Sequence, residues 1–262
     1  MFWGNKEYDA IDGINKNQES CMEKIKIIVL VLGVFMLCHA PVFALGKMPL
    51  SPKSGTHPQA STQQIESVNP LYPPKYTTEY IAEIKNDYKA VGKNEIFYVA
   101  LDMLKGTNGE YSRKAILGNN LTTRPMKIEF RNLGQINQNY ANYDALGWKK
   151  GKNLYIYINE THSSSPAIAL AALLSHEALH QDEFNSLPEE TYAWTMEAAV
   201  WTELLELYPD YDPGLDSLVL RENTLKKAFV RGDYSNRYIK KMVYSNNGYQ
   251  NLPESSPGFE AL

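Results

Sequence analysis

Residues 166–190 read PAIALAALLSHEALHQDEFNSLPEE, an apolar run that ends in a cluster of histidine and acidic residues. The run up to Leu174 contains no charged side chain, so we expect a helix that enters the hydrophobic core. Ser165 is suited to cap the N-terminus of this helix and Pro166 to occupy its first position. The helix is expected to continue to about Phe184 and to carry its polar side chains near its end.

A second helix is expected over residues 187–208, after a break at NSLP, with Pro209 at its end. Strands are expected at 127–133 and 153–159, where apolar and polar residues alternate and β-branched and aromatic residues are enriched. A turn is expected at 147–151, just before the second strand. Shorter helices are expected at 78–90, 94–105, 216–230 and 235–243. Together these elements predict an α+β fold.

His176, Glu177 and His180 form an HExxH motif near the end of the first helix. Their spacing places both imidazoles on one helix face about one turn apart, where both can bind a single Zn²⁺. Zinc lowers the pKa of a bound water towards neutrality, and a neighbouring carboxylate can take the proton and pass it to a leaving amine. We therefore expect two zinc ligands, His176 and His180, and a catalytic base, Glu177.

HEALH, followed by EETYAWTMEA at residues 189–198, resembles the gluzincin clan of zinc peptidases. The likeness is to small bacterial members in which a downstream Glu-x-x-Ala helix supplies the third ligand, and it covers about residues 150–208. It implies a small zincin-like domain with a short mixed sheet, one zinc ion, and hydrolysis of a peptide or protein substrate. It also implies that the strand at 153–159 lines the cleft, where an extended peptide could pair with it by strand addition.

Glu190, rather than Glu189, is expected to be the third zinc ligand. His180 and Glu190 lie equally far from the turn near Asn185, each about 7 Å along its helix axis, so they face each other at one level. Glu190 also falls within the apolar arc of its helix, whereas Glu189 lies towards the edge. Ser186 and Glu189 fit a capping box, in which Glu189 reaches back to the Ser186 backbone. The alternative is that both glutamates only favour the helix N-terminus electrostatically.

Other polar residues are candidates for supporting roles around the zinc site. Glu197 falls on the apolar arc of the second helix and is expected to hold a zinc ligand in place. His162 is either a cleft residue or polar surface. The resemblance implies an oxyanion-stabilising side chain, for which four tyrosines qualify equally: Tyr234, Tyr238, Tyr244 and Tyr249.

The N-terminal region has the layout of a secretory signal peptide. Lysines precede an apolar run at 27–38, and small residues follow up to Ala44. We expect residues 1–44 to be an N-terminal extension plus this signal, cleaved after Ala44, so that the protein is secreted or periplasmic. A membrane anchor retained through residues 27–45 is the alternative.

The rest of the chain is expected to form a tether and one domain. Residues 45–76 are rich in Pro, Ser and Thr, which favours an extended tether, and residues 77–262 are expected to form the zinc metallopeptidase domain. The two cysteines, Cys21 and Cys38, precede both segments. Any metal site in the domain must therefore use His, Asp or Glu.

The charge of the chain also restricts its partners. A formal net charge of −4 and a pI near 5.8 provide no basic field for phosphates, so nucleic acid is not expected as a partner. We therefore expect an exported zinc-dependent peptidase. The alternative is a cell-envelope binding protein with a structural or inactive zinc site, and Glu177 distinguishes the two, because a structural site does not need that carboxylate.

Overall fold

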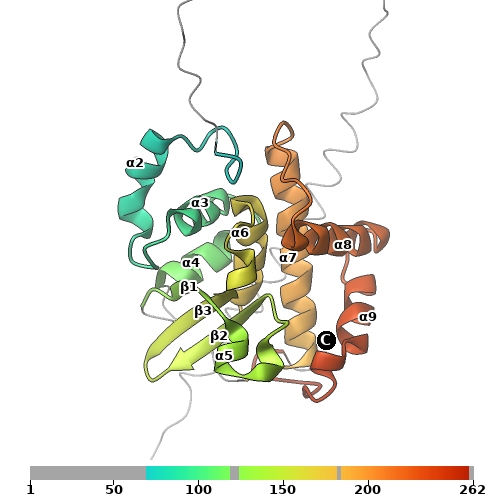
Figure 1. The fold of residues 1–262 in the computed structure, drawn as a ribbon. Coiled ribbons are helices and arrows are strands. Elements are labelled where there is room, and N and C mark those ends of the chain that lie inside the picture. The colour runs from blue at the N-terminus through green and yellow to red at the C-terminus, as the bar shows by residue number, and fades with distance from the viewer. Residues whose placement is uncertain (1–68, 119–123, 182–183, 260–262) are drawn as a thin grey trace, which may run out of the picture. The chain divides into compact units, whose positions relative to one another are not determined.

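A computed structural model describes residues 69–118, 124–181 and 184–259 of the chain (Figure 1). Its helices and strands, in chain order, are α2 (Thr78–Tyr88), α3 (Glu95–Met103), α4 (Glu110–Gly118), β1 (Lys127–Arg131), α5 (Leu133–Ile136), β2 (Ala145–Lys150), β3 (Asn153–Asn159), α6 (Ala167–Glu177), α7 (Leu187–Leu207), α8 (Ser217–Arg231) and α9 (Arg237–Ser245). Helices combined with one small sheet confirm the expected α+β class.

The sheet has the strand order β1-β3-β2, with β3 parallel to β1 and antiparallel to β2. It is therefore a short mixed sheet, and both predicted strands are present. β3 buries Ile156 and Ile158 in the core. β1 is shorter than predicted, because the Asn132 side chain accepts a hydrogen bond from the Gln135 N–H and begins α5.

β2 lies where the sequence predicts a turn. Gly147, Lys149 and Lys150 belong to the strand, and the turn comes only at Gly151, whose φ of +62° suits glycine. β3 is consequently paired along both of its edges. The prediction that a peptide adds to β3 is therefore wrong, and within the described ranges β1 and β2 are the strands that have a partner on one edge only.

α6 is buried along its whole length, as its apolar sequence predicts, and it packs against α3 and α7. Its end comes earlier than predicted. After Glu177 the Leu179 N–H donates to the His176 carbonyl and the His180 N–H to the Glu177 carbonyl, so each bond spans three residues instead of four. The α-helix therefore stops at Glu177 rather than near Phe184, and His180 lies on the tight turn that follows.

Ser165 does not cap α6, contrary to our expectation. Pro166 occupies the N-cap position, and the Ser165 hydroxyl instead donates a 2.7 Å hydrogen bond to Asp216. The same Asp216 carboxylate caps α8 by accepting from the Leu218 N–H. Ser165 thus joins the beginnings of α6 and α8.

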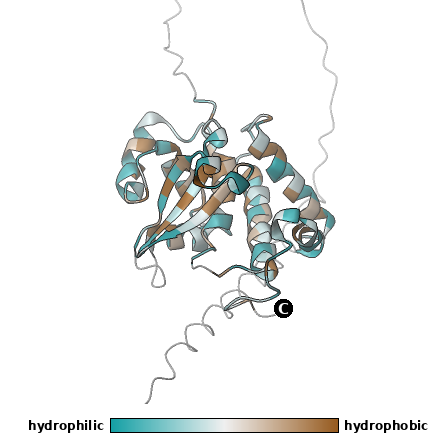
Figure 2. Ribbon diagram, turned by 60° about the horizontal axis from the view of Figure 1, so that its bottom comes forward, coloured by the Kyte–Doolittle hydropathy of each residue, from teal (hydrophilic) through white to brown (hydrophobic). Residues whose placement is uncertain are grey.

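α7 matches its predicted span closely and runs beside α6 (Figure 1). The Ser186 hydroxyl accepts a hydrogen bond from the Glu189 N–H at 3.2 Å, which confirms the cap at its N-terminus. α8 and α9, also found close to their predicted spans, pack against α7. Figure 2 shows hydrophobic residues along the strands and the inner helices. The end of α6, the turn after it and the start of α7 carry the HExxH motif and the glutamates that follow it.

The folded structure begins upstream of the predicted domain start at residue 77. The Ala167 N–H donates to the Leu71 carbonyl at 2.9 Å, and the buried Tyr76 hydroxyl donates to Asp102 at 3.1 Å. The signal segment, the cleavage point after Ala44 and most of the expected tether lie outside the described residues. Within the described ranges, no helix combines the length and apolarity needed to cross a membrane.

Candidate metal centre

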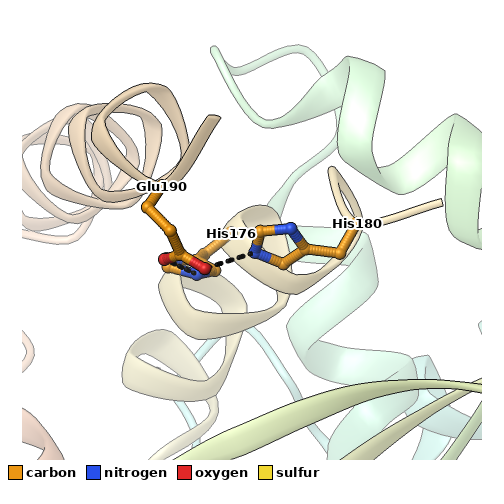
Figure 3. Close-up of side chains that lie close together, drawn as sticks. All are labelled: His176, His180 and Glu190. Atoms are coloured by element: carbon orange, nitrogen blue, oxygen red, sulfur yellow. Dashed lines mark ion pairs between the residues drawn. The ribbon is translucent and has the colours of Figure 1, made fainter. Parts of the chain in front are cut away.

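His176, His180 and Glu190 converge between the end of α6 and the first turn of α7 (Figure 3). Nε2 of His176 lies 3.7 Å from Oε2 of Glu190, and Nε2 of His180 lies 3.6 Å from Oε1. The three candidate ligand atoms all lie within 4.8 Å of one another, and His176 and Glu190 are buried. The three residues named from the sequence thus form a group that could hold a metal ion, called the metal group below.

The spacing of these atoms fits shared ligation rather than direct hydrogen bonding. Distances of 3.6–3.7 Å are too long for a hydrogen bond between a ring nitrogen and a carboxylate oxygen. Two ligands of a tetrahedral zinc ion, with bonds of about 2.0–2.2 Å, stand about 3.3–3.6 Å apart. Oε2 of Glu190 is also buried without a hydrogen bond of normal geometry, a situation that a bound cation would relieve.

The second oxygen of Glu190 is held in place by Asn185. The Asn185 amide nitrogen donates a hydrogen bond to Oε1 of Glu190 at 2.6 Å, so the Glu190 carboxylate has one orientation in the metal group. Although burial raises its pKa, the neighbouring His180 and His176 outweigh that effect, and the pKa of Glu190 is lowered. The side chain is therefore an ionised carboxylate at neutral pH, as a metal ligand must be.

His176 is oriented by Glu197, the residue expected to support a zinc ligand. Nδ1 of His176 lies 3.0 Å from Oε2 of Glu197. Arg221 donates to both oxygens of Glu197 and also lies 3.0 Å from Asp144. Burial raises the pKa of Glu197, but Arg221 and His176 lower it more, so it falls well below its usual range. Because an ionised Glu197 accepts from Nδ1, it leaves Nε2 free to face the metal group.

His180 is oriented in the same way by Glu189, in a role that the sequence does not predict. Nδ1 of His180 lies 2.9 Å from Oε1 of Glu189, and the Ser256 hydroxyl donates to Oε2 at 3.0 Å. Burial lowers the pKa of His180, but the carboxylates of Glu189 and Glu190 raise it more, to about 9. The Glu189 carboxylate therefore binds His180 and Ser256. In the predicted capping box it would instead bind the Ser186 backbone.

Glu177 lies beside the metal group without joining it. Its Oε1 atom is 4.0 Å from Nε2 of His176, and its side chain is almost fully buried. Burial raises the pKa of the Glu177 carboxyl, the two histidines oppose that rise, and Glu190 adds to it. A carboxylate with a raised pKa next to a metal group is suited to accept and return a proton.

β2 passes directly over this group at Gly147. A Cβ atom at position 147 would lie 3.3 Å from Cβ of His180 and 4.0 Å from Oε2 of Glu177. Only glycine leaves the backbone of β2 this close to the site without displacing a side chain. The sequence carried a usable signal, because glycine inside a strand often marks a close approach.

Of the four tyrosines named from the sequence, Tyr249 is the one that faces the metal group. Its hydroxyl interacts with Glu190, and it accepts a 3.2 Å hydrogen bond from Nε1 of Trp194. Burial, followed by the charge of Glu190, raises the pKa of Tyr249, so it keeps its proton at neutral pH. Tyr234 and Tyr244 are exposed, while Tyr238 contacts cations on the surface of α8 and α9.

His162 is neither exposed nor part of the metal group. It is buried, and its Nε2 lies 2.8 Å from the Asp144 carboxylate. Asp144 also pairs with Arg221, so His162 stands at the far end of the network that begins at His176.

The chain has no match among protein-family models, curated proteins or solved structures.

Proposed function

We propose that this chain is a zinc-dependent peptidase of the gluzincin type. The observation that supports this most is the buried Glu177 carboxylate beside two histidines and a glutamate, with a separate carboxylate orienting each histidine. A purely structural metal site has no use for the extra buried acid. The cost of burying Glu177 is therefore best explained by proton transfer.

His176, His180 and Glu190 are the residues that would hold the ion. Bound there, zinc supplies Lewis acidity, which acidifies water and polarises a carbonyl group. Glu177 accepts the proton of the attacking water and delivers it to the amine that leaves as the peptide bond breaks. The Tyr249 hydroxyl, directed by Trp194, donates a hydrogen bond to the negative charge that develops on the carbonyl oxygen.

The substrate in this proposal is a peptide or protein segment in extended conformation. β2 carries Gly147 next to His180 and Glu177, and its outer edge has no partner strand among the described residues. An extended peptide can hydrogen-bond along that edge, which would bring its backbone to the metal group. β2 thus takes the role that the sequence assigns to β3.

Export remains part of the proposal, on the evidence of the sequence. The apolar run at residues 27–38 and the small residues before Ala44 fit a cleaved signal, which would make the protein secreted or periplasmic. The intact mass of the exported protein should correspond to a chain beginning at Leu45. A mass that includes residues 27–45 would instead indicate a retained anchor.

The deciding experiment combines metal analysis with cleavage of a peptide library. Wild type should purify with one zinc ion per chain and cleave library peptides. Glu177→Gln should keep the zinc but lose at least about a hundredfold in turnover. His176→Ala should lose both properties.

Two outcomes would contradict the proposal. Equal cleavage by the wild type and the Glu177→Gln variant would mean that Glu177 is not the base. Full zinc occupancy without cleavage of any peptide would favour the alternative, a cell-envelope binding protein with a structural or inactive zinc site.

A further inference from the structure

Helices α8 and α9 carry six positive charges that have no acidic partner among the described residues. Within the described ranges, none of the following side chains lies within ion-pair distance of a carboxylate: Lys226, Lys227, Arg231, Arg237, Lys240 and Lys241. Of the cations in these two helices, only the inward-facing Arg221 is paired with carboxylates. No carboxylate neutralises these six cations within the described ranges, which leaves their charge available to an anionic partner.

The charge of α8 and α9 contrasts with the rest of the chain and corrects the expectation, drawn from the net charge, that the chain has no basic field for phosphates. Residues 217–245 contain seven basic and two acidic residues, a formal charge of +5, whereas the whole chain carries −4. The other residues together therefore carry −9. This asymmetry means that an anionic surface would attract the α8–α9 face and repel most of the remaining protein, which orients the molecule as it approaches.

A groove between the two helices gives the charged surface a definite shape. It has a volume of about 340 Å³ and is lined by Thr224, Lys227, Ala228, Arg231, Tyr238, Lys241, Met242 and Ser245. Three cations surround the Tyr238 ring, with Arg231 at 4.7 Å, Lys241 at 5.2 Å and Arg237 at 5.6 Å from its centroid. Lys227, Arg231 and Lys241 line this open groove, so it offers three positive charges to an anionic group.

The same two helices and the turn between them also carry exposed apolar and aromatic side chains. Val230, Tyr234 and Tyr244 are 41%, 39% and 38% exposed, and the Tyr244 ring also contacts Lys240. Tyrosines and lysines that flank an apolar residue suit the boundary between headgroups and acyl chains, where the rings and the aliphatic stems insert and the charges meet lipid phosphates. Nucleic acid offers no comparable apolar layer.

We propose that the α8–α9 face docks on the anionic headgroups of a lipid bilayer. The docked protein sits with its acidic remainder turned away from the lipid. This proposal does not depend on the peptidase function.

Vesicle flotation of the full chain tests the proposal. The two lipid surfaces are phosphatidylcholine alone and phosphatidylcholine with about one third phosphatidylglycerol. Wild type should prefer the anionic vesicles, and the preference should fall steeply with added salt. Lys227→Gln/Arg231→Gln/Lys241→Gln should weaken binding to the anionic vesicles by about a hundredfold and leave binding to the neutral vesicles unchanged.

A matched triple variant controls for the loss of charge itself. Lys93→Gln/Lys105→Gln/Lys114→Gln removes three exposed cations from other parts of the domain and should keep the preference of wild type. Lysine acetylation, measured by mass spectrometry, shows which surface contacts the vesicle. Anionic vesicles should protect Lys227 and Lys241 from acetylation but not Lys93 or Lys105. That protection can be read even if residues 27–45 insert into both kinds of vesicle.

Three results would overturn the proposal. They are equal protection of Lys227 and Lys241 by both kinds of vesicle, equal loss of anionic binding in the two triple variants, and protection of Lys227 and Lys241 by single-stranded DNA but not by vesicles. Glu177→Gln should dock like wild type, so a failure of the peptidase proposal and a failure of docking would be distinguishable.

Discussion

The Glu189 carboxylate accepts from Nδ1 of His180 at 2.9 Å, and this contact gives the two consecutive glutamates of α7 different tasks. Glu190 belongs to the metal group, and Glu189 contacts the outer ring nitrogen of His180. From the sequence alone, Glu189 is expected to be dispensable for zinc binding. The contact changes that expectation, because a carboxylate that orients a ligand typically contributes a factor of about 10–100 to metal affinity.

Zinc affinity should therefore fall in both glutamate variants, but by different amounts. Glu190→Ala removes a ligand and should abolish tight binding, whereas Glu189→Ala should cost about 10–100-fold. Competition with a chromogenic zinc chelator measures both. Glu83→Ala, at an exposed position on α2, is the control, and a larger loss in Glu189→Ala than in Glu190→Ala would reverse the assignment.

Ser256 should contribute to zinc binding through Glu189, although it lies far from the ligands in sequence. Its hydroxyl donates to Oε2 of Glu189 and contacts the Ser186 hydroxyl at 2.8 Å. Ser256→Ala should weaken zinc binding by about threefold to tenfold, less than loss of Glu189 itself. Ser256→Thr keeps the hydroxyl and should restore the affinity. The neighbouring Ser255 is exposed, so an equal loss in Ser255→Ala would rule out this specific role.

Tyr249→Phe should reduce turnover while leaving zinc in place. The variant keeps the ring packed against Trp194 but removes the hydroxyl that we assign to the developing oxyanion. The loss of one such donor costs about 10²–10³-fold in kcat, with little change in KM if the hydroxyl acts mainly in the transition state. Tyr244→Phe is the control on the exposed surface. An unchanged kcat in Tyr249→Phe would mean that the Tyr249 hydroxyl does not stabilise the oxyanion.

Acidification should remove a stabilising contribution from Glu110. Its hydrogen bonds to Arg113 lower the pKa of the folded carboxyl from 4.5 to about 2. Since the folded pKa is depressed, the contribution is present above about pH 4.5 and is lost as the pH falls towards 2. The pair is partly exposed, so solvent screening keeps the contribution below about 1 kcal/mol.

Urea unfolding measured between pH 6 and about pH 2 tests the role of Glu110. Glu110→Gln should be less stable than wild type near neutral pH, and the difference should shrink towards pH 2. Glu83→Gln, at an exposed position on α2, should show no such convergence. A constant difference between wild type and Glu110→Gln across the range would contradict the predicted linkage.

Local signals predicted the features that depend on neighbouring residues. The cap at Ser186 and the apolar spacing after it predicted α7 nearly to the residue. His176 and His180 do come together, but His180 lies on the turn after α6 and not on the helix face from which its approach to Glu190 was predicted. The end of α6 was missed because hydrogen bonds spanning three residues replace the helical ones after Glu177, and HEALHQDEF contains no glycine or proline to signal the change.

Features that depend on distant contacts could not be predicted. β2 becomes a strand by pairing with β3, although Lys149, Lys150 and the following Gly151 suggest a turn when taken alone. The role of Glu189 requires Ser256, 67 residues further along the chain, to occupy its second oxygen. Choosing Tyr249 among four equivalent tyrosines likewise depends on Trp194, 55 residues away, which directs its hydroxyl.

Tyr249 and Ser256 lie in the segment after α9, whereas the three candidate metal ligands all precede that segment in the chain. A ribosome makes about 5–20 residues per second and releases the N-terminal parts first. The HExxH helix therefore emerges well before the residues that complete its surroundings. If the proposed peptidase function holds, a nascent chain carrying His176 and His180 is inactive until Tyr249 and Ser256 follow, and this order of synthesis would spare the proteins of the cell that makes it.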